Sequence, residues 1–227
     1  MPRTTKAIEK LFYTGEQFLD NAAQDSEART LLAARGIDAA VLTPGRALYD
    51  AAKTAVAQGE ADFAAQLQAT DDFKVALALS WTEIQDLARV LAAAYAGQTE
   101  PLARLGLHQR RDKSTGESEI AWPLDKTLPH YLAWARNLTA RLTEPDLAAT
   151  AARFGYTAEA ITAMAARLET VSDRDDTQER IKAPARQSTQ ARGQAVAVFK
   201  TWLDQQFVAA RVALRGQTRL LELLSLR

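Results

Sequence analysis

Apolar residues recur at three- and four-residue steps along most of the chain, which is the spacing of one face of an α-helix. In the first half, Leu77, Ile84 and Leu91 lie on such a face, and Val196 and Leu203 lie on a similar face in the second half. Runs in which β-branched residues alternate with polar residues are absent from the sequence. The pattern therefore predicts an all-α protein without strands.

Capping and helix-stopping residues divide this pattern into separate helices. Thr70 has the character of an N-cap, and Thr43 before Pro44 has the character of a helix start. Near Pro184, a long helix is expected either to end at about Lys182 or to end earlier, with a new helix beginning at the proline. The expected helices are 4–23, 26–35, 44–67, 70–96, 99–107, 127–141, 144–154, one or two helices between 157 and 216, and a tail at 220–226.

One stretch of the chain, Gln68–Leu107, occurs twice. It aligns without a gap with Gln187–Leu226, which lies 119 residues further on, and 12 of the 40 aligned positions are identical. Only three of these identities are alanines, and the triplet at 97–99 recurs at 216–218. A self-match at a fixed spacing indicates a repeated structural unit. It predicts two tandem antiparallel helical bundles related by internal duplication.

The expected domain boundaries follow from the repeat and from a break in the apolar pattern. Residues 1–107 and 126–227 are predicted to form the two bundles. Residues 108–125 are charged, contain Gly116 and end near Pro123, so they are predicted to form a polar linker. Short connections between helices make neighbouring helices antiparallel, and three or four helices in each half are enough to close a core.

The charge balance and the absence of cysteine restrict the classes of function. The 227 residues carry 28 basic and 28 acidic side chains, so the chain as a whole has no strong attraction for nucleic acid or for an anionic membrane. With no cysteine, the chain has no disulfide, no thiolate nucleophile and no cysteine metal ligand. Neither a signal peptide nor a transmembrane segment is evident, so a cytoplasmic location is expected.

No constellation of residues typical of catalysis or metal binding stands out. Carboxylate–histidine sites in helical bundles use a Glu-x-x-His pattern, whereas Thr127 stands three residues before His130. The other histidine, His108, lies in the expected linker. Acidic pairs such as Glu83 and Asp86 are interpreted as solvated helix positions, and no glycine-rich phosphate loop is present. We therefore assign no catalytic, cofactor or metal residue, and we expect that the protein is not an enzyme.

A basic cluster marks the start of the expected linker. Its members are candidates for contacts with anions or nucleic acid, because lysine and arginine neutralise phosphate groups. Acidic residues at 112, 117 and 119 dilute the positive charge, so a solvated linker is the simpler interpretation. The members of the cluster are Arg104, His108, Arg110, Arg111 and Lys113.

Two tryptophans lie in corresponding helices of the two halves. At the 119-residue spacing, Trp81 aligns with Lys200, and Trp202 aligns with Glu83, so the tryptophans miss each other by two positions. They are therefore not one duplicated site. Packing in the core or at a helix edge is the simpler role for each, and a platform for a ligand is the alternative.

The second half of the chain resembles a known group of proteins. The pattern Phe207-x-Ala209-Ala210-Arg211-Val212-Ala213-Leu214 is followed by Leu220-Leu221-x-Leu223-Leu224-Ser225-Leu226, and Gly155-Tyr156-Thr157 precedes the long helix. These features are similar to those of uncharacterised bacterial all-helical proteins that carry two tandem helical-bundle repeats. The resemblance implies a fold, and it brings no activity, cofactor or catalytic residue.

Three functional hypotheses follow from these observations. The leading hypothesis is a non-enzymatic interaction or scaffold protein that binds a second copy of itself or another protein. The first alternative is a carrier of a small apolar ligand within one bundle, because alanine-rich helices with scattered aromatic residues leave room for a cavity. The second alternative is weak binding of nucleic acid through the Arg104–Lys113 cluster. Function is expected where the two halves differ or meet.

Overall fold

The computed structural model describes residues 6–111, 118–121 and 127–226, and this part of the chain is almost entirely helical. The all-α class predicted from the sequence is therefore confirmed. No described helix has an apolar stretch of the length that spans a bilayer. The elements are α1 (Lys6–Gln24), α2 (Ser26–Ala33), α3 (Ala39–Ala94), α4 (Thr99–Arg104), β1 (His108–Arg111), β2 (Ser118–Ala121), α5 (Leu128–Arg141), α6 (Pro145–Arg153), α7 (Ala158–Ala213) and α8 (Thr218–Leu223).

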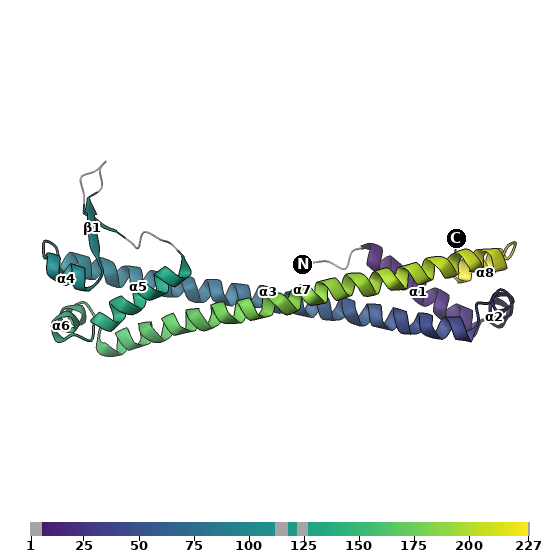
Figure 1. The fold of residues 1–227 in the computed structure, drawn as a ribbon, viewed down its shortest axis with the longest axis horizontal. Coiled ribbons are helices and arrows are strands. Elements are labelled where there is room, and N and C mark those ends of the chain that lie inside the picture. Colours follow the sequence, from purple (N-terminus) through teal and green to yellow (C-terminus); the bar gives the residue numbers. More distant parts are fainter. Residues whose placement is uncertain (1–5, 112–117, 122–126, 227) are drawn as a thin grey trace. The chain divides into compact units, whose positions relative to one another are not determined.

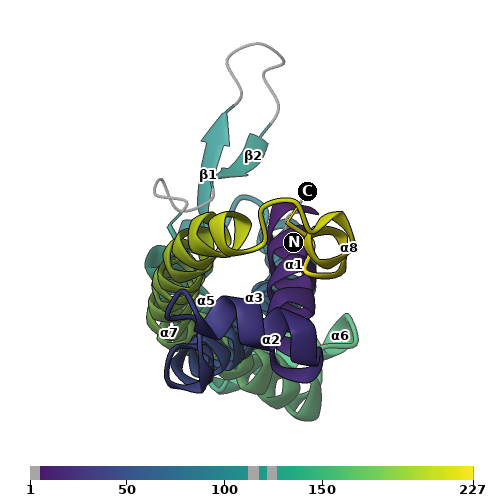
Figure 2. The same cartoon turned by 90° about the vertical axis from the view of Figure 1, so that its right-hand side faces the viewer.

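A short β-hairpin interrupts the helices within the expected linker. β1 and β2 pair in antiparallel fashion, with His108 opposite Ala121 and Arg111 opposite Ser118, and Figure 2 shows them side by side. The prediction that the chain has no strands is therefore wrong at this place. Each strand is only four residues long, too short to show the alternation of apolar and polar residues by which strands are recognised.

The helix α3 is a single element, where the sequence predicted two (Figure 1). It begins at Ala39 after Asp38, whose carboxylate accepts a hydrogen bond of 2.9 Å from the Ala40 amide. The predicted start at Pro44 is therefore wrong, and the proline lies near the first turns of the helix. The predicted break at Thr70 is also wrong, because neither glycine nor proline occurs between residues 60 and 96 to stop the helix.

The helix α7 is also continuous, from Ala158 to Ala213, and Pro184 lies inside it. The predicted end near Lys182 and the alternative start at Pro184 are both wrong. A proline within a helix removes one backbone hydrogen bond. No glycine occurs between Gly155 and Gly193 to add a second interruption, and Val171 before the proline and Ala185 after it are buried.

Other predicted helix ends are confirmed. The Asp25 carboxylate accepts a hydrogen bond of 2.9 Å from the Ala28 amide and caps α2. Thr127 is the N-cap residue of α5. Gly97 and Gly216, each three residues beyond the last residue of α3 or α7, adopt positive φ angles of 81° and 88°, a backbone region that glycine enters without a steric cost.

The helices form two compact units, and each unit combines segments from both halves of the chain. Unit 1 comprises Met1–Leu67 and Arg180–Arg227, and unit 2 comprises Gln68–Glu179. The predicted domains, 1–107 and 126–227, divide the chain differently. The reason is that α3 and α7 each continue for 56 residues without a break, so that each long helix supplies a segment to both units.

The core of unit 1 joins the N-terminal helices to the C-terminal end of the chain. Phe18 and Leu32, from α1 and α2, are fully buried together with Phe199 and Leu203 of α7 and Leu224 after α8. Gly45 of α3 packs against Trp202, and Gly59 packs against Arg192. Within unit 1, the α3 and α7 segments therefore run in opposite directions.

The core of unit 2 is built in the same manner from the middle of the chain. Leu87 and Leu91 of α3 are fully buried with Leu138 of α5, Leu147 of α6 and Leu168 of α7. Of the apolar residues that the sequence placed on one face in this stretch, Ile84 and Leu91 are buried and Leu77 is partly buried.

The long helices are also joined by polar contacts in unit 2. Arg174 and Arg167 of α7 form ion pairs with Asp72 and Glu83 of α3, respectively. The lower-numbered residue of α3 contacts the higher-numbered residue of α7, so the two segments run in opposite directions here as well.

Candidate interaction surface

The part of α7 that belongs to unit 1 has two faces of different exposure. Phe199, Leu203 and Ala210 are completely or almost completely buried against the other helices of the unit. Val208 and Val198, by contrast, have exposed fractions of 64% and 52%. A helix on the surface of a globular protein normally presents charged and polar residues to solvent. These exposed valines therefore require an explanation.

The exposed valines belong to a regular row on the helix. Six exposed residues follow one another at steps of four, three, four, three and four, which is the spacing of the contact positions in a coiled coil. None of the six is charged, and we call the row the valine stripe. Its members are Gln194, Val198, Thr201, Gln205, Val208 and Val212.

A shallow groove of about 350 Å³ lies beside the valine stripe in unit 1. Leu48 of α3 lines one side, and Trp202 with Ala197 of α7 lines the other, together with three residues of the stripe. The indole of Trp202 is held by Phe18 and Phe199, at ring-centroid distances of 6.4 and 6.2 Å. The valine stripe and the groove form one continuous, largely apolar surface.

A related groove of about 370 Å³ lies in unit 2. Trp81 and Tyr131 meet there with ring centroids 4.7 Å apart. The Tyr131 hydroxyl is 2.8 Å from the hydroxyl of the buried Ser80, which satisfies both polar groups. Leu77 and Leu128 add apolar walls, and a lysine at position 74 is the charged residue of the lining.

The two grooves share residues at the 119-residue spacing of the repeat. Ala78 and Thr82 line the groove of unit 2, and their counterparts Ala197 and Thr201 line the groove of unit 1. All four residues are exposed, so their identity is not required by a core. The self-match found in the sequence therefore includes exposed groove residues as well as helix ends and core positions.

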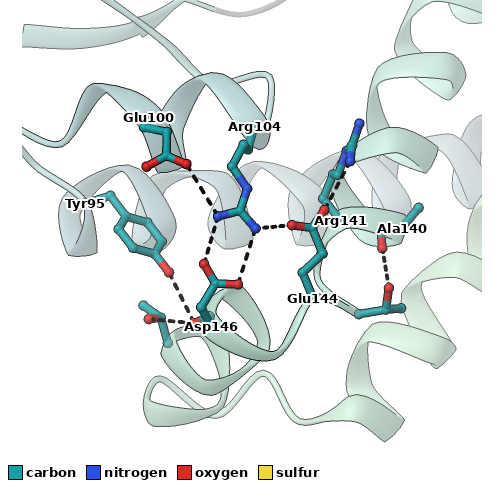
Figure 3. A network of polar contacts seen from close by, with 9 residues as sticks. Tyr95, Glu100, Arg104, Ala140, Arg141, Glu144 and Asp146 are labelled. Atoms are coloured by element: carbon teal, nitrogen blue, oxygen red, sulfur yellow. Dashed lines mark hydrogen bonds and ion pairs between the residues drawn. The ribbon is translucent and has the colours of Figure 1, made fainter.

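The predicted basic cluster divides into two parts in the structure. Arg104, at the end of α4, donates a hydrogen bond of 2.8 Å to Asp146 and a second hydrogen bond to Glu144, and it forms a weaker ion pair with Glu100 (Figure 3). The Arg104 guanidinium is therefore already paired with carboxylates, and through Glu144 and Asp146 it links α4 to the start of α6. His108, Arg110 and Arg111 lie on β1, and Lys113 lies outside the described residues. Anion binding by these four residues stays a prediction.

Ion pairs at this place also shift the pKa values of the groups involved. The hydrogen bonds from Arg104 lower the pKa of the Asp146 carboxyl and of the Glu144 carboxyl below their usual values, and Arg141 contributes to the shift of Glu144. The same bonds raise the pKa of Arg104. All of these groups are solvated, so their contribution to stability is modest.

The lowered pKa values predict a pH-dependent effect of the Arg104→Met substitution. A carboxyl whose pKa is lower in the folded state stabilises the fold above its unfolded pKa, and this stabilisation is lost as the pH falls through the folded pKa. The melting temperature of Arg104→Met is therefore expected to be below that of the original chain at pH 7, with the difference closing in acid. Thermal melts by circular dichroism between pH 2 and 7 measure it. A difference that is constant with pH would contradict the expectation.

The side-chain clusters described by the structure offer no other site of recognisable chemistry. Among the described residues, no group of three or more histidine, aspartate or glutamate side chains lies close enough together to hold a metal ion. The described buried side-chain polar atoms all have hydrogen-bond partners. The valine stripe is a prominent exposed apolar feature of the described surface, and Val75 and Leu79 of α3 in unit 2, with exposed fractions of 60% and 59%, form another.

Sequence reasoning assigned the buried face of α7 and missed the stripe on its opposite side. A regular three- and four-residue spacing was present at 194–212 and could have been found. Its exposure, however, follows only from the packing of unit 1.

Comparisons of the chain with models of protein families, with curated proteins and with solved structures find no match. The helical character implied by the resemblance noted in the sequence is present in the structure. Membership of a bacterial group with two tandem repeats stays a prediction.

Proposed function

We propose that this chain is a non-catalytic interaction protein that associates with further copies of itself through the valine stripe on α7. The observation that carries the proposal is the row of six exposed, uncharged residues at coiled-coil spacing in unit 1. Exposed apolar surface of this kind is typical of sites at which proteins meet. The neighbouring groove beside Trp202 extends the same surface.

The proposal includes an origin of the fold by internal duplication, giving two antiparallel helical bundles. The starts of α2, α3 and α4 recur 119 residues later as the starts of α6, α7 and α8. Positive φ angles recur at the same spacing, at Gly36 and Gly155, at Gly97 and Gly216, and at Gly106 and Ser225. The repeated turns support a common ancestor for the two halves more strongly than helical sequence similarity does, because positive φ angles are rare outside glycine.

Ion pairs that hold the short helices α4 and α8 at corresponding places also support the duplication. Arg219 of α8 forms ion pairs with Asp25 and Glu27 at the start of α2. The equivalent carboxylates 119 residues later, Glu144 and Asp146, receive Arg104 of α4. Each tail helix therefore binds the acidic start of a helix from the opposite half of the chain.

The duplication predicts a stabilising substitution at Ser225. This residue has a φ angle of 54°, where its counterpart is Gly106 with a φ angle of 66°. The left-handed region costs an ordinary L-residue about 1–2 kcal/mol, so Ser225→Gly is expected to raise the free energy of unfolding by about 1 kcal/mol. Urea titration measures the change. The reverse substitution, Gly106→Ser, serves as the matched control and should destabilise unit 2. A Ser225→Gly variant that is less stable than the original chain would contradict the prediction.

The C-terminal part of the valine stripe distinguishes the two halves of the duplication, whereas Val75 and Leu79 of α3, the counterparts of Gln194 and Val198, are exposed and uncharged as well. The positions of α3 that correspond to Gln205 and Val208 are Asp86 and Arg89, which form an ion pair on the surface of unit 2. A position that the fold alone requires would be alike in both halves. The replacement of this charged pair by uncharged residues in α7 supports a role that only unit 1 performs.

The mass of the protein in solution tests the proposal. Light scattering over a range of concentrations is expected to show dimers or larger assemblies of the 24.8 kDa chain. Val208→Glu should shift the assembly toward monomer by at least about tenfold in dissociation constant, because it places a charge in a desolvated contact. Val75→Glu is the matched control, since Val75 has a similar exposed fraction of 60% but lies in unit 2. A chain that is monomeric at every concentration, or equal effects of the two variants, would refute the proposal.

A second candidate function is the carriage of a small apolar ligand in the groove beside Trp81. The groove volume of about 370 Å³ lies at the lower end of the range found for small-molecule sites, and apolar walls with few polar groups are typical of such sites. Native mass spectrometry of the purified protein tests this function. A co-purifying molecule that is lost when Leu77→Trp fills the groove would support it, and its absence from the original protein would count against it.

A further inference from the structure

We infer that the second copy binds the valine stripe in antiparallel orientation and in one register, with Asp204 of each copy opposite Arg211 of the other. This inference rests on the proposed self-association and adds the geometry of the contact. It starts from the residues that flank the stripe, because flanking residues set the orientation and register of paired helices.

The charged residues beside the stripe are few and of opposite sign. In a heptad repeat lettered abcdefg, the contact residues occupy positions 'a' and 'd'. If residues 198, 205 and 212 are assigned to position 'a' and residues 201 and 208 to position 'd', Asp204 and Arg211 occupy successive 'g' positions. The g position before them is Ala197, and the e positions are Ala195, Trp202 and Ala209. The flanks of the stripe therefore carry one acid and one base, both on the same side.

The placement of these two charges favours antiparallel over parallel pairing. In a parallel pair, a g residue faces an e residue of the partner helix. Asp204 and Arg211 would then face uncharged residues such as Ala209 or the backbone near Gly216. In an antiparallel pair, g residues face g residues, so one acid and one base on the same flank can meet reciprocally. Opposite charges at such positions attract by a modest amount, and like charges repel by a similar amount.

Charge also selects one register among the antiparallel alternatives. When Gln205 lies opposite Val208 of the second copy, Asp204 faces Arg211 of the second copy on one flank. On the other flank, the large Trp202 faces the small Ala209 of the second copy. A shift by one heptad places Asp204 opposite Asp204 of the second copy and Trp202 opposite Trp202 of the second copy. The shifted register therefore combines like charges with two large side chains, and it is disfavoured.

Both charged side chains keep the capacity to make this contact. Asp204 pairs with Lys200 on its own helix, in a solvated i,i+4 pair in which both side chains are more than half exposed. The Nε–H group of Arg211 donates a hydrogen bond of 2.8 Å to the Leu226 carbonyl, and a guanidinium has four further N–H donors.

In the inferred register, Thr201 lies opposite Val212 of the second copy and Val198 opposite Arg215 of the second copy. The contact therefore covers the stripe from Val198 to Val212 and reaches Arg215, just after the end of α7.

Cysteine cross-linking tests the register directly, because the chain has no cysteine of its own. Thr201→Cys and Val212→Cys, each on its own full-length chain, are mixed and treated with a short bis-maleimide linker. The inferred register predicts a covalent dimer in the mixture and little from either variant alone. In this register, residue 212 of one copy lies opposite residue 201 of the other. The two copies of residue 212 are therefore eleven residues apart along the helix axis, about 16 Å at 1.5 Å per residue, which is too far for the short linker.

Other cross-links would overturn the register. Dimers formed by Val212→Cys alone would show parallel pairing. Dimers from a mixture of Gln194→Cys with Val212→Cys would show the shifted register. If the original chain is dimeric by light scattering and none of these pairs cross-links, this inference fails while the proposed self-association stands. If the chain is monomeric, both fail.

Charge reversal provides an independent measurement on the same proteins. Asp204→Arg is expected to raise the dissociation constant of the dimer about tenfold, because two like-charged contacts replace two attractive ones. The double variant with Asp204→Arg and Arg211→Asp should recover the original affinity. Circular dichroism melts of each variant report whether loss of the Arg211 contact with Leu226 disturbs the fold. An affinity that Asp204→Arg leaves unchanged would overturn the inference, and so would a well-folded double variant that recovers nothing.

Discussion

Replacing Phe199 with alanine is expected to unfold α1 and leave α5 protected, although Phe199 and α5 belong to the same half of the sequence. Phe199 is fully buried in unit 1, where its ring contacts Phe12 and Tyr49 at centroid distances of 6.3 and 5.5 Å. A Phe→Ala change in a core costs about 3–5 kcal/mol. Because the lost contacts lie in unit 1, the loss of stability should appear first in the N-terminal helices.

Amide hydrogen exchange followed by mass spectrometry measures this effect helix by helix. Leu87→Ala is the reciprocal control, because Leu87 lies in the first half of the sequence and is buried in unit 2. It is expected to reduce protection in α5 and α6 by about 2–5 kcal/mol. Loss of protection in α5 after Phe199→Ala, with α1 unchanged, would contradict the assignment of the units. Equal loss in both units would show that they unfold together.

Replacing Gly45 with alanine is expected to destabilise the protein, whereas the same change at Gly193 should stabilise it. Both glycines lie inside long helices, where alanine is favoured by about 1 kcal/mol. A Cβ atom at Gly45 would overlap the Trp202 ring, while nothing lies within 4 Å of a Cβ at Gly193. Overpacking costs about 1–3 kcal/mol, so the gain in helix propensity is lost at Gly45 and kept at Gly193.

Urea unfolding of the two variants measures the difference, which is expected to be about 2 kcal/mol between them. A double variant with Gly45→Ala and Trp202→Leu should recover part of the loss, because it removes the ring that the new methyl group meets. Equal stability of Gly45→Ala and Gly193→Ala would show that the helices separate freely at this contact, contrary to the close packing described for unit 1.

The periodicity of apolar residues was sufficient to predict which residues of each helix face a core. Ile84 and Leu91 in the first half, and Leu203 in the second, are buried as the spacing indicated, and Leu77 and Val196 are partly buried. Helix stops at glycine were equally predictable, since the conformational freedom of glycine is a local property. The same local reasoning failed at Thr70 and Pro184, because their preferences amount to a few kcal/mol at most and packing along a long helix outweighs them.

The candidate site was less accessible to sequence reasoning. Arg104 appeared as a member of a basic cluster, and only the fold brings it to Glu144 and Asp146 from 40 residues away. The valine stripe has a recognisable spacing in the sequence. A row of valines with this spacing predicts a buried face as readily as an exposed one, because spacing carries no information about what covers it.

The sequence by itself determined that the chain is helical, where most helices stop, which side of each helix is buried and that one stretch occurs twice. These properties depend on residues within a few turns of one another. Only the tertiary structure decided that Phe199 packs with α1, that Leu87 packs with α5, and that the valine stripe of α7 is left uncovered within unit 1. These pairings join residues that are far apart in the chain, and the spacing of apolar residues within one helix does not identify the helix that covers them.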